Sequence, residues 1–548
     1  MSNESLKSVL QRRALDLAVW FIVVVCLAMM GLEVLARFTV HTILDDAYMF
    51  VRYADHVLQN GTIAWNPGGP PTYGLTSPLY LLVIIPVRLL TPTNPAMTVM
   101  LSSLISGMFF LGLTGFLLHR MLRTYRLFEK LGFVVLAVVL TLGIGRLAPH
   151  FSSGMDTMFV LSCFTFYIIL VLESQDSTGF ATSVAAGIVG GGLYFARPDL
   201  MIFSTLVPFS VFLFARERIR RRAGLMMLGV TLFVLVLELA LAFNYFGSPV
   251  ALPFFAKGLK MYGENIYRNF RGVAVREFVV YVLTWWILFV GIGYEFGVRI
   301  SGRRMVRPLE IALFTGLVLF ISYYLFFVWQ IMHYYQRFYL PTLPALIELS
   351  IYVLLERLRV SEWRAGIEER LLRLGPRAIF VSASLIVGLL TPSVLLNTTT
   401  RISTELTDGE FLKTDIWDGY WARNWYRLDA FSKLPDEIVI ATTEVGHPGV
   451  LNPDKTVIDI AGLNDTEIAL HGFNSRRLFE TYHPDLVYFP HRHYQEMIRE
   501  IEENPYFREH YDYYPAPALG VRLGVALLRE SKHYESMKQI MESPSGRE

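Results

Sequence analysis

Twelve long apolar segments are the feature that most restricts how this chain can fold. Each holds about 16–25 residues with few charges, and a membrane-spanning helix needs roughly 20. Of the 548 residues, 53% are hydrophobic and only 18% are charged, a balance that argues against a soluble enzyme of this size. We therefore expect a polytopic α-helical membrane protein. The segments cover residues 14–38, 77–92, 96–119, 128–146, 156–174, 179–195, 199–215, 223–245, 277–297, 308–328, 338–356 and 378–396.

Basic residues mark one side of the membrane, because short cytoplasmic loops collect Lys and Arg. The N-terminus and four connections are strongly basic, and placing all five in the cytoplasm leaves one crossing too many before the basic loop at 120–130. The weakest segment there is 77–92, which contains Pro86 and Arg88 and ends in the breaker-rich TPTNP. We assign it to a re-entrant or interfacial helix, which leaves about eleven spans; two helices crossing as an irregular pair is the alternative. The outer face then receives residues 40–76, 147–155, 196–198, 246–276, 329–337 and those after about 397.

An acidic pair, Asp45 and Asp46, stands near the start of the outer loop 40–76. A short amphipathic stretch follows, in which Tyr48 and other aromatic residues alternate with charged ones such as Arg52, a composition that suits the headgroup zone. Adjacent carboxylates at a membrane surface are costly unless they hold a cation, a cationic group or a transferable proton. The local sequence fits helix capping and catalysis equally well, and the two are compatible.

The other outer segments carry ionisable residues at the ends of apolar segments, where such residues are functional candidates. They are Asp156 in SSGMDT, Arg197 and Asp199 in FARPDL, Lys257 in the aromatic loop YFGSPVALPFFAKG, and His333 and Arg337 in WQIMHYYQRFYLPTLP. Each also has a purely structural interpretation: an ion pair for Arg197 with Asp199, an interfacial histidine, or a lysine that snorkels to a phosphate. Their common face favours a single site.

Cations and carboxylates on one face fit a site for a lipid phosphate and a sugar. Lys257, Arg337 and His333 can neutralise a leaving phosphate, while a carboxylate can take the proton of an attacking hydroxyl. A P-loop, a Rossmann glycine motif or a zinc-protease motif is found at no credible place in the sequence. The net charge of +2 gives no broad nucleic-acid footprint.

The outer loop resembles the opening signature of bacterial membrane glycosyltransferases of the GT-C architecture. It is most similar to the branch that includes the mycobacterial terminal arabinofuranosyltransferases, with protein mannosyltransferases and lipid A aminoarabinose transferases as relatives. The shared motifs are the acidic pair, the aromatic-rich helix, Asn66-Pro67-Gly68 and Thr76-Ser77-Pro78. Later motifs are similar but depart in detail. Asp156 stands where the branch more often has glutamate, Leu252-Pro253-Phe254 replaces a proline–asparagine pair, and the acidic residue upstream of Arg337 is missing.

The resemblance implies an inverting glycosyltransferase that moves a sugar, with arabinofuranose implied by the branch, from a polyprenyl-phosphate donor. The acceptor would be a hydroxyl of a cell-envelope glycan, lipid or protein on the outer face of the plasma membrane. Family precedent favours Asp45 as the base, with Asp46 orienting the acceptor or a divalent cation. No cofactor is required, although Mg²⁺, Mn²⁺ or Ca²⁺ at the pair is an alternative. Tyr48, Arg52, Asp156, Arg197 and Asp199 are expected to bind or support the substrate.

After about residue 397 the composition changes to that of a soluble domain. DEIVIATTEVG, KTVIDIAGLND and PDLVYFP each contain a short β-branched or apolar run that ends in turn residues, with helical stretches between them. We expect a small α/β domain over residues 397–548, packed on the outer face of the transmembrane domain 1–396. Loops after strands are good ligand positions, so Glu444, His447, Asp459 and Asn464 could contact the acceptor or serve as caps.

The sequence also allows two functions other than glycosyl transfer. A transporter or flippase of a lipid-linked sugar would share the apolar segments, but such proteins often contain internal repeats, and no convincing repeat is present. A non-catalytic envelope assembly subunit could keep the same fold. The outer domain of about 150 residues favours an enzyme that handles an acceptor.

Overall fold

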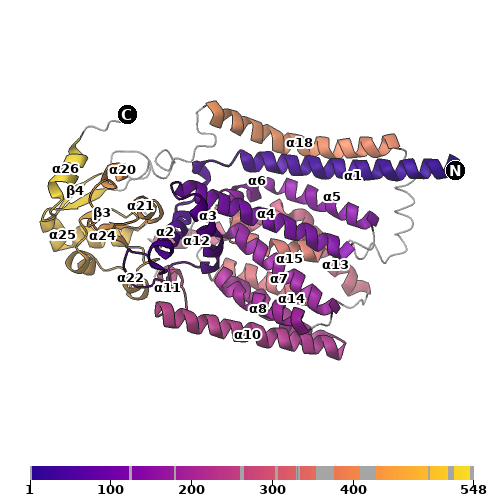
Figure 1. Ribbon diagram of the computed structural model, residues 1–548, viewed down its shortest axis with the longest axis horizontal. Coiled ribbons are helices and arrows are strands. Elements are labelled where there is room, and N and C mark those ends of the chain that lie inside the picture. Colours follow the sequence, from indigo (N-terminus) through magenta and orange to yellow (C-terminus); the bar gives the residue numbers. More distant parts are fainter. Residues whose placement is uncertain are drawn as a thin grey trace.

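The apolar segments form long helices that lie side by side, with a smaller α/β domain at one end of them (Figure 1). The computed structural model describes residues 3–122, 126–177, 180–258, 264–302, 306–328, 330, 334–352, 376–407, 427–490, 494–515 and 524–543. The main helices of the bundle are α1 (Asn3–Leu35), α4 (Pro95–Leu122), α5 (Arg126–Leu142), α7 (Thr157–Ser177), α8 (Phe180–Ala196), α9 (Met201–Phe214), α10 (Arg218–Phe246), α12 (Glu264–Thr284), α13 (Trp286–Gly302), α14 (Pro308–Phe326) and α18 (Pro376–Thr407).

Length and apolar character decide which of these helices can cross a membrane. Within the described part of the chain five helices qualify, and seven do when each of two bent pairs counts as one span. Shorter apolar helices cover residues 78–90, 180–196, 198–214 and 376–392, overlapping expected segments. These helices fit the polytopic membrane protein that the sequence predicted, while the number of eleven spans stays a prediction.

Two expected spans are broken by sharp bends that lie against each other. α12 and α13 meet at 80° around Trp285, and α5 meets the helix that starts at Ile144 at 61° across Gly143. The indole ring of Trp285 packs so closely that a Cβ atom on Gly143 would lie 2.4 Å from it. The expected apolar segment 277–297 therefore lies over two helices joined at a bend, and the sequence has no proline or glycine at residues 284–286 that would have signalled the kink.

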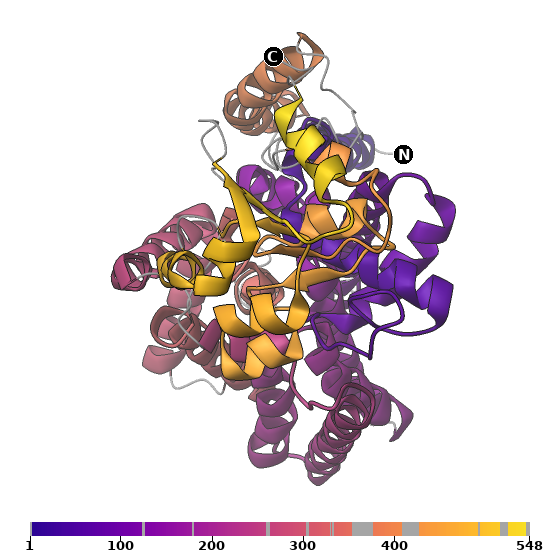
Figure 2. The same cartoon turned by 90° about the vertical axis from the view of Figure 1, so that its left-hand side faces the viewer.

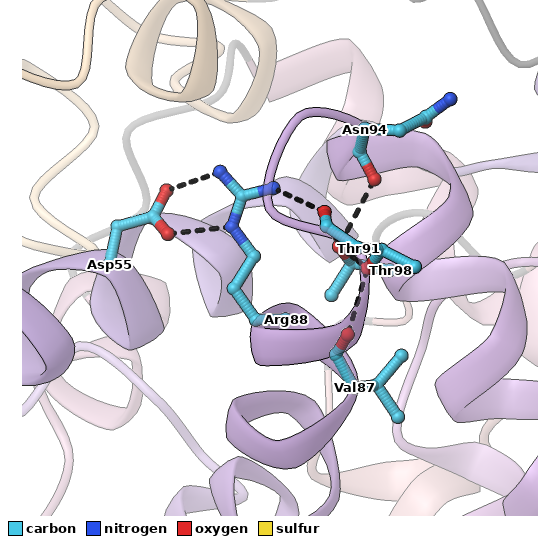
Figure 3. Close-up of polar contacts among 6 residues, drawn as sticks. All are labelled: Asp55, Val87, Arg88, Thr91, Asn94 and Thr98. Carbon is cyan, nitrogen blue, oxygen red and sulfur yellow. Dashed lines mark hydrogen bonds and ion pairs between the residues drawn. The ribbon is translucent and has the colours of Figure 1, made fainter.

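The weak segment 77–92 folds as a 3₁₀ turn, η2 (Pro78–Tyr80), followed by α3 (Leu81–Leu90). The guanidinium of Arg88 in α3 donates two hydrogen bonds to the carboxylate of Asp55 in α2 (Asp45–Asn60), from Nε to Oδ1 at 2.7 Å and from Nη2 to Oδ2 at 3.1 Å (Figure 3). Its Nη1 donates to the carbonyl of Thr91 at 3.1 Å, just past the end of the helix. This bidentate ion pair fixes α3 to α2. The assignment of segment 77–92 to a re-entrant or interfacial helix stays a prediction.

The expected helix over 338–356 is irregular where the structure describes it. It begins with a 3₁₀ turn, η6 (Leu340–Thr342), continues as α15 (Leu343–Ile347) and ends in the π-helical η7 (Glu348–Tyr352). α18 runs to Thr407, past the expected end of the last apolar segment. It lies alongside α1 for most of its length (Figure 1).

The C-terminal domain, which faces the viewer in Figure 2, contains a five-stranded sheet in the order β2-β1-β3-β5-β4. Its strands are β1 (Ile440–Thr442), β2 (Val457–Asp459), β3 (Leu486–Tyr488), β4 (Tyr511–Tyr514) and β5 (Val525–Leu528). β1 pairs in parallel with β2 and β3, whereas β5 is antiparallel to β3 and β4. The first three strands lie in the segments that the sequence predicted. Apolar side chains fill both faces, so the sheet is the centre of the α/β domain.

Candidate active site

A cavity of about 350 Å³ lies at the end of the helix bundle that carries the C-terminal domain. Its charged wall comes from segments far apart in the sequence, and its apolar wall comes from valine, proline and aromatic side chains. Its lining includes five of the residues predicted from the sequence: Asp156, Arg197, Asp199, Lys257 and Arg337. The structure therefore brings together most of the ionisable residues that charge patterning placed on one face.

Arg197 and Asp199 stand between α8 and α9 as an ion pair, with Nε 3.0 Å from Oδ2. Tyr324, near the end of α14, joins them: its hydroxyl donates to Asp199 Oδ2 and accepts from Arg197 Nη2 at 3.0 Å. The other carboxylate oxygen of Asp199, Oδ1, is buried without a hydrogen bond. The structural interpretation of this pair is thus correct, yet the pair also lines the cavity and leaves one acceptor oxygen free.

Arg337 follows two residues with left-handed backbone angles, Tyr335 (φ 50°) and Gln336 (φ 66°). Neither residue is glycine, so the turn holds strain of the kind that clusters at functional sites. The guanidinium of Arg337 lies 3.8 Å from the carboxylate of Asp46, and its Nη1 is buried without a hydrogen-bond partner among the residues that the structure describes. Arg337 therefore presents unused donors beside the acidic pair.

Lys257 lies on the short helix α11 (Leu252–Gly258), which begins where the Leu252 amide donates to the carbonyl of Tyr73 at 2.8 Å. Burial, together with the positive charge of Arg337, lowers the pKa of Lys257 to about 8. The ammonium is therefore easily neutralised, and an anion placed beside it would restore its charge.

Asp156 is buried just before α7 and lines the same cavity. Burial raises the pKa of its carboxyl group, although the nearby guanidinium groups of Arg197 and Arg337 oppose the rise. The predicted residue His333 lies outside the described residues.

The two members of the acidic pair face different neighbours. Asp45 is buried, and its carboxylate accepts hydrogen bonds from the Gly446 amide (2.9 Å), the His447 amide (2.8 Å) and His447 Nδ1 (2.7 Å). Gly446 begins α21 (Gly446–Leu451) in the C-terminal domain, where the N-cap residue Val445 supplies no side-chain bond. Asp45 thus caps a helix 401 residues away in sequence, while its own helix has Leu44 as N-cap.

Asp46 lies instead beside Arg337, a residue that lines the cavity. A quarter of its side chain is exposed, and no contact closer than the 3.8 Å ion pair holds its carboxylate within the described part of the chain. Burial raises its pKa, Arg337 lowers it and Asp45 raises it further. A raised pKa brings a carboxylate closer to the value that a general base needs.

Tyr48 and Arg52, which the sequence placed in a substrate-binding role, lie away from the cavity. The Tyr48 ring packs edge-on against His447 at a centroid distance of 4.6 Å. All five N–H groups of Arg52 are used at 2.6–3.1 Å, by the carbonyls of Trp65, Gly449, Asn452 and Lys455 and by Asn66 Oδ1. A guanidinium with every donor satisfied fixes the C-terminal domain to α2 and has nothing left for a substrate.

One residue of the site, Tyr324, was not singled out by the sequence, and Glu444 was predicted only as an acceptor contact or a cap. Tyr324 sits in the apolar run ISYYLFF, where a tyrosine is typical of a membrane interface. Glu444 follows β1, and burial beside Asp45 and Asp46 raises its pKa well above the usual value. The sequence placed Glu444 and His447 in a loop after a strand, but nothing local indicated that this loop would meet the acidic pair.

Among the described residues, no group of three or more His, Cys, Asp and Glu side chains is arranged to hold a metal ion. Arg337, which lines the cavity, already lies beside Asp46.

Comparison with solved structures identifies the architecture. The crystal structure of ArnT from Cupriavidus metallidurans, bound to undecaprenyl phosphate, is similar to this chain with a TM-score of 0.53 and 12% sequence identity. The match covers 93% of this chain and 97% of ArnT. The chain has the GT-C fold. The sequence matches no protein-family profile and no curated protein.

The extent of the likeness to ArnT matters for the site. Because the match covers nearly the whole of both chains, it includes the bundle and most of the C-terminal domain. At 12% identity the likeness carries the fold alone, so the chemistry of this chain has to come from its own side chains.

Proposed function

We propose that this chain is an inverting glycosyltransferase that moves a sugar from a polyprenyl-phosphate donor to a hydroxyl group. The observation that carries the proposal is the cavity lined by Lys257, Arg337 and apolar side chains, with the Asp46 carboxylate 3.8 Å from the Arg337 guanidinium. Unused cationic donors, a carboxylate and an apolar surface are the three elements that such a transfer needs. The solved ArnT structure holds undecaprenyl phosphate, which supports a lipid of this class as the donor carrier.

The donor phosphate fits between Lys257 and Arg337. The unpartnered Nη1 of Arg337 and the ammonium of Lys257 would compensate the negative charge that the phosphate gains as the sugar leaves. Pro253, Phe254 and Phe338 lie along the same wall and suit the first isoprene units of the lipid. Asp156 and Asp199, with its free oxygen, remain to accept hydrogen bonds from sugar hydroxyls.

We assign the role of base to Asp46. Family precedent favoured Asp45, but three hydrogen bonds already occupy both oxygens of that carboxylate. Among the described residues Asp46 is held only by an ion pair at 3.8 Å, so it can accept the proton of the acceptor hydroxyl as the hydroxyl oxygen attacks the anomeric carbon. The bond between the anomeric carbon and the phosphate oxygen breaks in the same step, and polyprenyl phosphate leaves with the electron pair of that bond.

The remaining features of the proposal follow from the sequence. The basic loops place the cavity and the C-terminal domain on the outer face of the plasma membrane, where a cell-envelope glycan, lipid or protein would supply the acceptor. Resemblance to the terminal arabinofuranosyltransferases makes arabinofuranose the first donor sugar to test. The proposed chemistry requires no metal, since Lys257 and Arg337 take the place that a cation would otherwise fill.

A donor panel tests the proposal. Purified protein is incubated with polyprenyl-phosphoarabinose, polyprenyl-phosphomannose and undecaprenyl-phosphoaminoarabinose, with an envelope acceptor fraction, and released polyprenyl phosphate is measured. One donor should be consumed, and Asp46→Asn should lower its turnover about 10²–10⁴-fold, the usual contribution of a general base. Glu496→Gln, an exposed carboxylate of the C-terminal domain, is the matched control. If no donor is consumed in the presence of a competent acceptor, the function is not glycosyl transfer from these lipids.

A further inference from the structure

A second cavity, of about 410 Å³, lies between α1, the bend that follows α5, and α18. It shares no lining residue with the first cavity. Its walls come from the end of α1 and the residues just after it, from the residues around the bend and from the second half of α18: Glu33, Arg37, Thr141, Leu142, Ile144, Gly145, Val394 and Arg401. α1 and α18 run side by side, and their ends near these residues point toward the C-terminal domain (Figure 1).

The charges of this second cavity do not balance. Glu33 is buried, pairs with Arg37 at 2.9 Å, and also accepts a hydrogen bond from Thr398. Arg401 forms no ion pair and no hydrogen bond with any described residue. One carboxylate against two guanidinium groups leaves the lining with a net charge of +1, and the excess lies on Arg401.

The cavity also opens onto the apolar surface of the bundle. Leu142 lines it and is 44% exposed, and Leu389 on the neighbouring turns of α18 is 80% exposed. Apolar side chains this exposed on long apolar helices face lipid tails rather than water. A ligand in this cavity would therefore have its polar part beside Arg401 and an apolar part along the helices.

We propose that the second cavity binds the phosphodiester headgroup of a lipid, with Arg401 as its principal contact. A phosphodiester carries a single negative charge and so matches the net charge of the lining, and a guanidinium binds phosphate oxygens in a bidentate manner. The alternative for Arg401 alone is a side chain that snorkels into the solvated interface. That alternative accounts neither for the cavity nor for the ion pair of Glu33 with Arg37 in its lining. The proposal does not depend on the transfer reaction proposed above.

Native mass spectrometry of the full chain in detergent tests the proposal. The probes are phosphatidylglycerol, a polyprenyl-phosphomannose and the zwitterionic phosphatidylcholine. The variants are Arg401→Gln, Arg401→Lys and Arg377→Gln, the last at the opposite end of the same helix and exposed. We expect Arg401→Gln to weaken retention of an anionic lipid about tenfold, whereas Arg401→Lys keeps most of it and Arg377→Gln keeps all of it.

The outcomes separate the two sources of the phosphodiester. Loss of phosphatidylglycerol alone identifies a bilayer phospholipid, and loss of the polyprenyl lipid alone identifies a second polyprenyl site. Equal retention by Arg401→Gln and Arg377→Gln overturns the proposal, as does displacement of bound lipid by inorganic phosphate at equal concentration. Sugar transfer is measured on the same samples, and because Arg401 lies outside the transfer site, either proposal can fail without the other.

Discussion

The replacement of Asp45 by asparagine is the sharpest test of how the acidic pair divides its work. Oδ1 of Asp45 accepts two hydrogen bonds from His447, and Oδ2 accepts one from the Gly446 amide. Asparagine has one acceptor oxygen. If this oxygen takes the place of Oδ1, the new NH₂ group faces the Gly446 N–H, donor against donor. One hydrogen bond is lost, and the other two lose the negative charge of their acceptor.

The magnitude follows from these three contacts. A hydrogen bond to a charged group contributes about 1.5–3 kcal/mol and a neutral one about 0.5–1.5 kcal/mol. Loss of the Gly446 bond and weakening of the two His447 bonds therefore cost together about 4 kcal/mol of docking free energy. The Asp45 side chain is 6% exposed, so water does little to replace the lost contact. Asp46→Asn should cost little in comparison, because its only ion pair is 3.8 Å long and a quarter of its side chain is exposed.

The assay compares both variants by thermal unfolding in detergent and by limited proteolysis between the bundle and the C-terminal domain, alongside donor turnover. We expect Asp45→Asn to unfold at lower temperature and to expose the C-terminal domain to protease. Asp46→Asn should keep wild-type stability and lose turnover. The reasoning is refuted if Asp45→Asn is as stable as the wild type yet inactive while Asp46→Asn still transfers sugar, since Asp45 would then be the base.

Three further predictions concern the same region. Because the pKa of Lys257 is lowered to about 8, its positive charge is present below that pH and lost above it. We therefore expect kcat/KM for the donor to fall between pH 7 and 9, and Lys257→Arg to remove this fall. A pH profile in Lys257→Arg that still matches the wild type would exclude Lys257 as the phosphate ligand. Gly446→Ala would place a Cβ atom 1.8 Å from the Asp45 carbonyl oxygen. This clash should loosen the docking of the C-terminal domain and make the domain more susceptible to limited proteolysis. A variant as resistant to protease as the wild type would contradict the docking geometry. Arg52→Lys offers three hydrogen-bond donors in place of five. It should lower the unfolding temperature and leave the KM for the donor unchanged in the folded fraction. A raised KM for the donor without destabilisation would show instead that Arg52 binds the substrate.

The sequence predicted the helical bundle and the composition of the cavity well, because both follow from forces that act along the chain. Apolar length determines which segments become bundle helices, and basic loops determine which ends of those helices lie together. Asp156, Arg197, Lys257 and Arg337 all stand at such ends, so one charge rule was enough to group them. The bend at Trp285 could not be predicted, because no proline or glycine stands at residues 284–286 and the ring of Trp285 packs against Gly143, a residue distant in sequence.

The roles of Tyr48 and Arg52 could not be predicted in this way. An amphipathic helix with aromatic and basic residues is typical of a membrane interface, and the helix that carries them has that composition. Their actual partners lie about 400 residues further along the chain, and a single sequence contains no signal of such pairing. The same holds for Glu444, whose raised pKa depends on carboxylates of the distant loop.

Helix geometry explains how two adjacent aspartates come to do different work. Successive residues on an α-helix point about 100° apart, so Asp45 and Asp46 at the start of α2 cannot face the same partner. One carboxylate caps the first turn of α21, where the free amides and the helix dipole favour a negative charge, and the other lies beside Arg337 at the cavity wall. Capping and catalysis are therefore assigned to different members of the pair. Because the two share one turn of backbone, a shift of α21 must also move Asp46. The position of the proposed base, Asp46, therefore depends on how the C-terminal domain docks on Asp45. Correct docking of that domain and correct alignment of Asp46 for proton transfer require the same arrangement of α2 and α21.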